Sequence, residues 1–270
     1  MANALIIITN DDGIGSPGLR AAAEAVQGLG EVIIVAPTEQ RSAAGRGFWG
    51  DRSQALRQVD YLVDGKRLLA YHCDCSPAQV VDHGVRVLCP GRRPDLILSG
   101  INYGENLGLD VTLSGTIGAA LQGASMGIPA LAVSLVTDPA FHFAYGEVDW
   151  TAARHFARIF SQRVLLQNLP PDVDLLKVDI PDCATKDTPW RTTRLSRHPY
   201  RTFSMESPGS LSKIGDLKAR VRDDLSSSEE DSDVRAVMVD RVVSVTPLSL
   251  DLSSRIDLNL LGESLKKEVS

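Results

Sequence analysis

The chain of 270 residues has little of what marks secreted or membrane proteins. Its four cysteines are too few and too scattered for a disulfide framework. No apolar run approaches the roughly 20 residues that a membrane span requires. The start of the chain also lacks the basic stretch of a signal peptide. We therefore expect an intracellular, cytoplasmic protein without a membrane partner.

Positive charge is also scarce. The chain has 28 Lys and Arg residues against 34 Asp and Glu, which gives a net charge of −6. A general basic surface for wrapping a nucleic-acid polymer is thus excluded, and we expect no such partner. An acidic protein that handles a phosphorylated compound needs local positive charge, which a bound metal ion supplies most simply.

The first half of the chain alternates short apolar runs with helical patterns, as a parallel α/β sheet does. The runs at 5–8 and 96–98 are apolar throughout, which is typical of strands covered on both faces. Further strands are predicted at 32–35 and 130–133, and helices at 17–29, 77–88, 117–126 and 150–165. The stretch from Ser42 to about Val63 is expected to be a loop or small hairpin outside the sheet.

The character of the sequence changes after about Pro181. Residues 190–195 and 234–245 alternate as strands do, and a terminal helix is predicted from Ser253 to Glu268. An acidic stretch at 226–233 between them is expected to be a solvated loop. We therefore divide the chain into a catalytic core, residues 1–185, and a C-terminal extension, residues 186–270.

Polar residues follow three of the predicted strands. Asp11 and Asp12 come after the first strand, Ser42 after the second, and Asn102 after the run at 96–98. In open α/β sheets ligands bind beyond the carboxyl ends of the strands. Two carboxylates, a hydroxyl and an amide carbonyl form an all-oxygen set that suits Mg²⁺ or Mn²⁺. Asn10-Asp11-Asp12-Gly13 alone would indicate a turn, but the matching residues at two other strand ends favour a metal site.

A second element is Ser114-Gly115-Thr116 at the start of a predicted helix. A helix N-terminus offers unpaired N–H groups and partial positive charge, and is therefore suited to phosphate. The hydroxyls of Ser114 and Thr116 would add two donors. A plain helix cap is the alternative interpretation.

Two other motifs compete with this interpretation. Gly13-x-Gly15-x-x-Gly18, with Glu39 downstream, matches a dinucleotide-binding fingerprint. However, Asp11 and Asp12 precede the glycines, and Pro17 removes an amide from the turn. Cys73-Asp74-Cys75, with His72 and His83 nearby, has the ligand types of zinc but not the usual spacing, so buried thiols on a strand are the better explanation.

Several ordered segments resemble the SurE (survival protein E) family over about residues 5 to 250. The segments that carry the resemblance are Thr9–Ile14, Ser16–Leu19, Ala36-Pro37, Arg41–Ala43, Pro94–Leu96, Ser99–Asn102, Gly104, Asn106–Gly108, Asp110-Val111, Ser114–Thr116 and Val243–Leu248.

The resemblance implies a Rossmann-like three-layer α/β/α core with a mostly parallel sheet. It also implies a C-terminal β-hairpin and helix that are exchanged between subunits in homodimers or homotetramers. The implied activity is hydrolysis of nucleoside 5′-monophosphates, and also of 3′-monophosphates and short polyphosphate in some members. One divalent metal ion per subunit would be the cofactor.

The resemblance also implies roles for single residues. Asp11, Asp12, Ser42 and Asn102 match the metal ligands of the family, and Asp11 and Asp12 are the expected catalytic residues. The expected phosphate-binding residues are Asn10, Asn106, Ser114, Gly115 and Thr116.

The sequence departs from the family pattern at three places. Gln79 replaces an acidic residue, Ala43 replaces a glycine, and Lys177-Val178-Asp179-Ile180-Pro181 replaces a usual Asn-Val-Asn-x-Pro. None of these changes removes a proposed metal ligand. A covalent aspartyl-phosphate on Asp11 or Asp12 and a non-catalytic nucleotide or metal sensor remain as alternatives.

Overall fold

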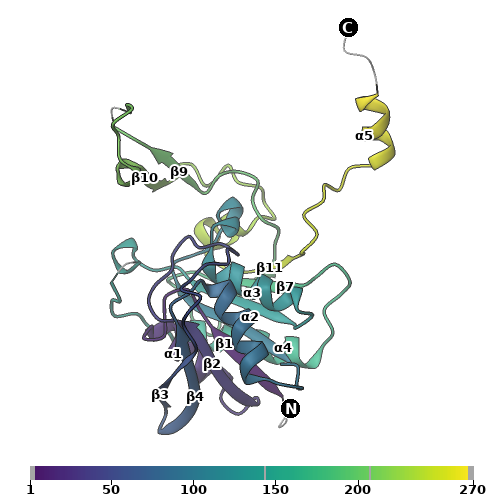
Figure 1. Ribbon diagram of the computed structural model, residues 1–270. Coiled ribbons are helices and arrows are strands. Elements are labelled where there is room, and N and C mark those ends of the chain that lie inside the picture. Colours follow the sequence, from purple (N-terminus) through teal and green to yellow (C-terminus); the bar gives the residue numbers. More distant parts are fainter. Residues whose placement is uncertain (1–3, 143, 207, 267–270) are drawn as a thin grey trace.

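The computed structural model describes residues 4–142, 144–206 and 208–266 (Figure 1). Its strands are β1 (Leu5–Thr9), β2 (Glu31–Pro37), β3 (Arg57–Val63), β4 (Lys66–Cys73), β5 (Leu96–Tyr103), β6 (Ala130–Leu135), β7 (Leu175–Ile180), β8 (Trp190–Thr192), β9 (Arg201–Ser204), β10 (Lys218–Val221) and β11 (Val243–Leu248). Its α-helices are α1 (Pro17–Val26), α2 (Pro77–Leu88), α3 (Gly115–Ser125), α4 (Thr151–Leu166) and α5 (Leu258–Leu265).

A nine-stranded sheet in the order β3-β4-β2-β1-β5-β6-β7-β11-β8 forms the centre of the described chain. The six strands from β4 to β7 run parallel. Strands of the opposite direction flank these six: β3 pairs antiparallel with β4, and β11 pairs antiparallel with β7 and parallel with the edge strand β8. The predicted α/β fold with a mostly parallel sheet is therefore confirmed.

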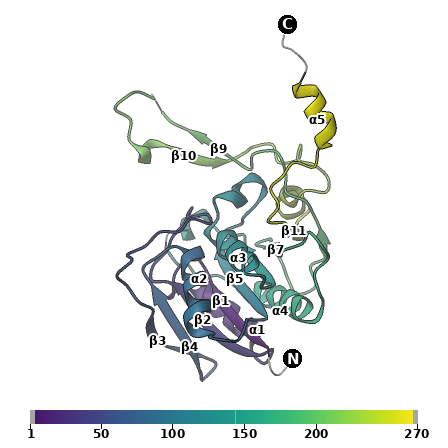
Figure 2. The same ribbon diagram turned by 45° about the vertical axis from the view of Figure 1, so that its right-hand side comes forward.

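Helices cover both faces of the sheet (Figure 2). Ile6 and Ile8 of β1 belong to the apolar cluster that includes α1 and α4, whereas Ile7 belongs to the cluster of α2 and α3. All three isoleucines have no exposed surface. This explains why the first strand is apolar without alternation: successive side chains point to opposite faces, and both faces are covered.

Helix α1 packs closely against β5 at the end where the polar residues gather. Ser16 caps the helix by accepting a hydrogen bond from the Gly18 amide (3.2 Å), and Pro17 occupies the first turn. A Cβ atom at Gly18 would lie 2.0 Å from the Ile101 carbonyl oxygen. Only glycine allows this approach. It therefore sets how closely α1 packs against β5, the strand that carries Asn102.

Several elements differ from the sequence prediction. The stretch predicted to lie outside the sheet contains β3 and leads into β4, and both strands join the main sheet. Residues 234–245 are not a strand pair, because Arg235–Val239 forms a π-helical turn and β11 starts at Val243. Strand β7 was not predicted, since the charged Lys177 and Asp179 interrupt its apolar pattern.

The C-terminal part of the chain contributes two strands to the main sheet and also forms a separate hairpin and helix. Strands β8 and β11 join the main sheet, so the predicted boundary at residue 185 does not coincide with the edge of the sheet. The hairpin of β9 and β10 and helix α5 extend from the sheet domain (Figure 1). The terminal helix starts later than predicted, at Leu258, and residues 267 and 268 of that prediction lie outside the described residues. None of the described helices combines the length and apolarity that crossing a bilayer requires.

The close packing of α1 gives a first prediction. Gly18→Ala should lower the free energy of unfolding by about 1–3 kcal/mol, because the clash with the Ile101 carbonyl outweighs the gain in helix propensity. Gly15→Ala is the matched control, since a Cβ there would meet no atom within 4 Å. Urea denaturation of both variants measures the difference. Equal midpoints for the two variants would contradict the proposed packing constraint.

Candidate active site

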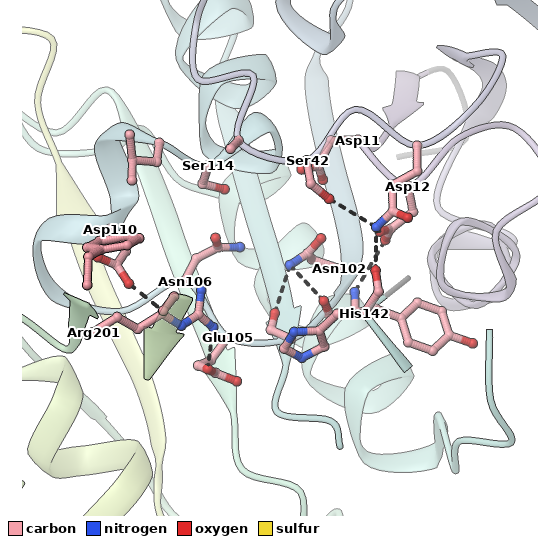
Figure 3. Close-up of a pocket in the computed structure, with 17 residues that line it drawn as sticks. Asp11, Asp12, Ser42, Asn102, Glu105, Asn106, Asp110, Ser114, His142 and Arg201 are labelled. Carbon is pink, nitrogen blue, oxygen red and sulfur yellow. Dashed lines mark hydrogen bonds and ion pairs between the residues drawn. The ribbon is translucent and has the colours of Figure 1, made fainter. Parts of the chain in front are cut away.

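A cavity of about 280 Å³ lies at the carboxyl ends of the central parallel strands. All four predicted metal ligands line it, and so do Asn106 and Ser114 (Figure 3). The strand order reverses at β1, because β2 lies on one side of it and β5 on the other. This is where open α/β sheets bind ligands. Residues from three distant segments thus face one space.

Asp11 is held from the side of α3. Its carboxylate accepts a short hydrogen bond from the Thr116 hydroxyl, and only 6% of the residue is exposed. A Cβ atom at Gly115 would lie 2.7 Å from Asp11 Oδ2, so the helix start approaches as closely as glycine permits. Burial raises the pKa of Asp11 to about 6, although the bond from Thr116 acts in the opposite direction.

Asp12 is even less exposed, at 2%, and its carboxylate has only long hydrogen bonds. Its carboxylate accepts from the Tyr103 amide (3.3 Å) and from Gln40 Nε2 (3.4 Å). Burial, and then the negative charge of Asp11, raise the pKa of Asp12 well above its usual range. Two adjacent buried carboxylates repel each other when both are ionised, and a bound cation would relieve this repulsion.

Ser42 and Asn102 complete the oxygen set. Gln40 Nε2 donates to Ser42 Oγ (3.0 Å). Asn102 Nδ2 donates to the carbonyl oxygens of Gly104 (2.8 Å) and Tyr103 (3.3 Å), which orients the amide and leaves its Oδ1 as the free acceptor. Two carboxylates, a hydroxyl and an amide oxygen fit a hard divalent cation such as Mg²⁺ or Mn²⁺.

The phosphate side of the cavity is formed by Ser114 and Asn106. Ser114 caps α3, and its Oγ accepts from the Ile117 amide (3.1 Å), so its own proton remains available. Asn106 Nδ2 donates to Ser134 Oγ (2.8 Å) with one of its two hydrogens. Both residues line the cavity and have a hydrogen available to donate to an anion there.

Three other predicted phosphate-binding residues have different roles. Both ends of the Asn10 amide bind Gly13, at 3.1 and 3.2 Å, so Asn10 shapes the turn and does not line the cavity. The Thr116 hydroxyl is bound to Asp11, and Gly115 packs against the same carboxylate. Thr116 and Gly115 therefore position the Asp11 carboxylate. The sequence could not show this, because the contact joins segments 105 residues apart.

The structure also adds residues that the sequence analysis missed. Arg201 at the start of β9 donates to Glu105 (2.8 Å) and lies 3.9 Å from Asp110. Phe203 of the same strand lines the cavity. In Figure 3, Arg201, Glu105 and Asp110 lie on the side opposite to Asp12. No local sequence signal links Arg201 to Glu105, since the two residues are 96 positions apart.

His142 is a further lining residue without a predicted role. Its carbonyl oxygen accepts from Gln40 Nε2 (2.6 Å), whereas its ring Nε2 is buried without a hydrogen-bond partner in the described structure. Burial lowers the pKa of His142, which favours the neutral imidazole. The side chain contributes a polar ring beside Gly104 in the wall of the cavity.

The glycine-rich turn lacks the free amides that a dinucleotide requires. The amides of Gly13, Ile14, Ser16 and Gly18 donate to Asn10 Oδ1, Pro37 O, Gly13 O and Ser16 Oγ, respectively. Residue 17 is proline and has no N–H. A pyrophosphate would therefore find most donors of this turn already bound.

The alternative zinc site also lacks support. Cys73 and Cys75 are buried in the apolar cluster of α2 and α3, and burial raises the pKa of the Cys75 thiol to about 12. Zinc binds the thiolate form. Within residues 4–142, 144–206 and 208–266, no three His, Cys, Asp or Glu side chains are grouped as a metal site. The strand-end set contains only two carboxylates.

Comparison with known proteins identifies the family of the chain. The family model of the survival protein SurE matches residues 6–202. The chain belongs to the SurE family. It is 40% identical to the 5′-nucleotidase SurE of Methanothrix thermoacetophila, over 97% of this chain and 98% of that protein. It is also 40% identical to 5′-nucleotidase SurE 1 of Thermus thermophilus, over 97% and 98%.

The fold comparison gives the same result for SurE. The crystal structure of the SurE protein from Aquifex aeolicus superposes with a TM-score of 0.71 at 28% sequence identity. The match covers 97% of this chain and 98% of that one. The likeness therefore includes the C-terminal segments as well as the sheet.

The contact between Thr116 and Asp11 gives a second prediction. Thr116→Val keeps the volume of the side chain but removes the hydroxyl that holds the Asp11 carboxylate. Affinity for Mn²⁺, measured by calorimetry, should fall by about 10- to 100-fold, as is usual when the partner of a metal ligand is lost. Thr116→Ser retains the hydroxyl and should bind nearly as the parent does. Equal affinities for the two variants would exclude this positioning role.

Proposed function

We propose that this protein is a metal-dependent 5′-nucleotidase, which hydrolyses nucleoside 5′-monophosphates to nucleoside and phosphate. The main support is the convergence of Asp11, Asp12, Ser42 and Asn102, from three strand ends, on one cavity. The relatives named 5′-nucleotidase SurE, which match nearly the full length of the chain, support the substrate class.

The four oxygen-bearing residues would hold one divalent cation, Mg²⁺ or Mn²⁺. When bound, such an ion polarises a phosphoryl oxygen and makes a water molecule more acidic. The catalytic role of Asp11 and Asp12 is to provide its charged ligands. Thr116 and Gly115 hold Asp11 in place, and the hydrogen bonds of Asn102 to Gly104 and Tyr103 fix its amide oxygen.

The other side of the cavity would bind the phosphate group. Ser114 and Asn106 supply donors for the phosphoryl oxygens, which carry the charge in the transition state. The cavity continues to Arg201 and Phe203 of β9, which would face the nucleoside. A covalent aspartyl-phosphate on Asp11 or Asp12 is the less favoured mechanism. The Asp11 carboxylate already accepts a hydrogen bond from Thr116, and both carboxylates are needed as metal ligands.

The proposal extends to substrate range, assembly and location. We include 3′-monophosphates and short polyphosphate as further substrates, and a homodimer or homotetramer formed through the C-terminal extension. Helix α5 exposes apolar side chains, with Leu258 74% and Leu265 76% exposed, which favours a covering partner chain. A cytoplasmic location accords with the low cysteine content.

Removing one ligand charge provides a direct test. Asp12→Asn should reduce phosphate release from AMP by orders of magnitude, because the amide cannot replace the carboxylate as a charged ligand. The denaturation midpoint should not fall, since the Asp12 carboxylate accepts only long hydrogen bonds. Asp95→Asn is the matched control. This carboxylate lies just before β5, at the opposite end of the parallel strands from the cavity, and accepts a hydrogen bond from the Leu5 amide (2.8 Å). Near-normal turnover of Asp12→Asn would contradict the site.

Metal removal separates the proposal from its alternatives. Dialysis against EDTA should abolish phosphate release across a panel of 5′- and 3′-monophosphates, and Mg²⁺ or Mn²⁺ should restore it. A dinucleotide-binding protein would instead change NAD(P)H fluorescence without metal. A sensor would bind AMP in calorimetry without turnover. Either result, in place of metal-dependent phosphate release, would overturn the nucleotidase assignment.

A further inference from the structure

A cluster of three charged side chains lies inside the protein, away from the oxygen set. Lys177 and Asp179 of β7 and Asp233 near the C-terminal end of the chain have no exposed surface. Lys177 Nζ lies 2.5 Å from Asp179 Oδ2 and 2.9 Å from Asp233 Oδ2. We call these three residues the buried ion triad. Lys177 and Asp179 occupy two of the positions at which this chain departs from the family pattern.

Stability alone does not explain this triad. Removing charges from water is costly, and well-packed apolar side chains often serve as well or better. Burial raises the pKa of Asp179 to about 6, and the ammonium group of Lys177 opposes this shift. The two carboxylates raise the pKa of Lys177 despite its complete burial. A positioning role would instead be visible in the hydrogen bonds that the triad makes to the backbone.

Both backbone polar groups of Asn106 are bound by the triad. The Asn106 amide donates to Asp179 Oδ1 (2.8 Å), and Lys177 Nζ donates to the Asn106 carbonyl oxygen (2.9 Å). The side chain of Asn106 lines the cavity on the phosphate side. The backbone that carries this side chain is thus held by charge-assisted hydrogen bonds on both of its polar groups, which are stronger than neutral ones.

Asp233 extends the same network to the C-terminal segments. Its Oδ2 accepts from the Gly108 amide (2.9 Å), two residues after Asn106. Its Oδ1 accepts from the Ser196 amide (3.0 Å), in the segment that leads to Arg201 on β9. One carboxylate therefore joins the phosphate side of the cavity to the chain segment that brings Arg201 to it.

We propose that Lys177, Asp179 and Asp233 are positioning residues, which hold the Asn106 backbone at the distance that phosphate binding requires. This inference rests on the proposed function. The triad would affect substrate binding only by setting the position of Asn106. Asn106 Nδ2 has one hydrogen on Ser134 and a second available for phosphate, so a small shift of its backbone changes that contact.

A double-mutant cycle between Lys177 and Asn106 tests the inference. Lys177→Met removes the donor to the Asn106 carbonyl, and Asn106→Ala removes the phosphate contact. Each change should raise KM for AMP about tenfold, the effect of losing one hydrogen bond to a charged group, with a smaller change in kcat. The double variant should be no worse than Asn106→Ala alone, because Lys177 acts only through Asn106. Multiplying effects, or an unchanged KM in Lys177→Met, would overturn the inference.

The control is a buried polar network that does not contact Asn106. The Thr193 hydroxyl lies 2.8 Å from both Ser244 Oγ and Thr246 Oγ1 of β11. Thr193→Val should lower thermal stability and leave KM unchanged. If Lys177→Met does not fold, Lys177→Gln, which keeps an N–H donor without the charge, takes its place, and a KM between those of the parent and Asn106→Ala is expected.

The same cycle distinguishes this inference from the proposed function. If the parent protein releases no phosphate from any nucleotide, the nucleotidase assignment fails. The cycle is then measured as affinity for inorganic phosphate by calorimetry, with the same non-additive result expected. Additive losses of phosphate affinity, or no phosphate binding by the parent, would overturn the inference. If the parent is active and the KM effects multiply, the inference alone fails.

Discussion

Two carboxyl groups lie next to each other at the end of β1, almost without exposure to water, and their mutual repulsion is the constraint on which the site depends. Burial raises the pKa of both groups, and the charge of Asp11 raises that of Asp12 further. Such a pair stores an unfavourable interaction that a divalent cation relieves. Ser42 and Asn102 line the same cavity, and their oxygen atoms would be further ligands of that cation.

The surrounding structure holds this pair in place by close packing. Gly115 allows α3 to contact Asp11, and Gly18 allows α1 to contact the backbone of β5. On the phosphate side the buried ion triad binds the backbone of Asn106. Strands and helices thus determine the position of the paired carboxylates, whereas a charged network inside the protein holds the Asn106 backbone.

The sequence predicted the parts of the site that depend on strand ends. Asp11, Asp12, Ser42 and Asn102 each follow a strand, and the carboxyl ends of parallel strands meet at one edge of a sheet. It did not predict β7, because Lys177 and Asp179 look solvent-exposed in the sequence, whereas the fold pairs Lys177 with both Asp179 and Asp233 inside the protein. Arg201 was missed for a similar reason: it reaches Glu105 only through the fold, 96 positions away. Asn10 and Thr116 were expected to bind phosphate, but their side chains are bound to Gly13 and Asp11.

Crystals of the protein soaked in Mn²⁺ would test the central claim most directly. The anomalous difference map should contain one strong peak in the cavity, within about 2.0–2.3 Å of oxygen atoms of Asp11, Asp12, Ser42 and Asn102, as hard divalent ions require. A map without a peak at this position, or with the ion bound away from both carboxylates, would contradict the account.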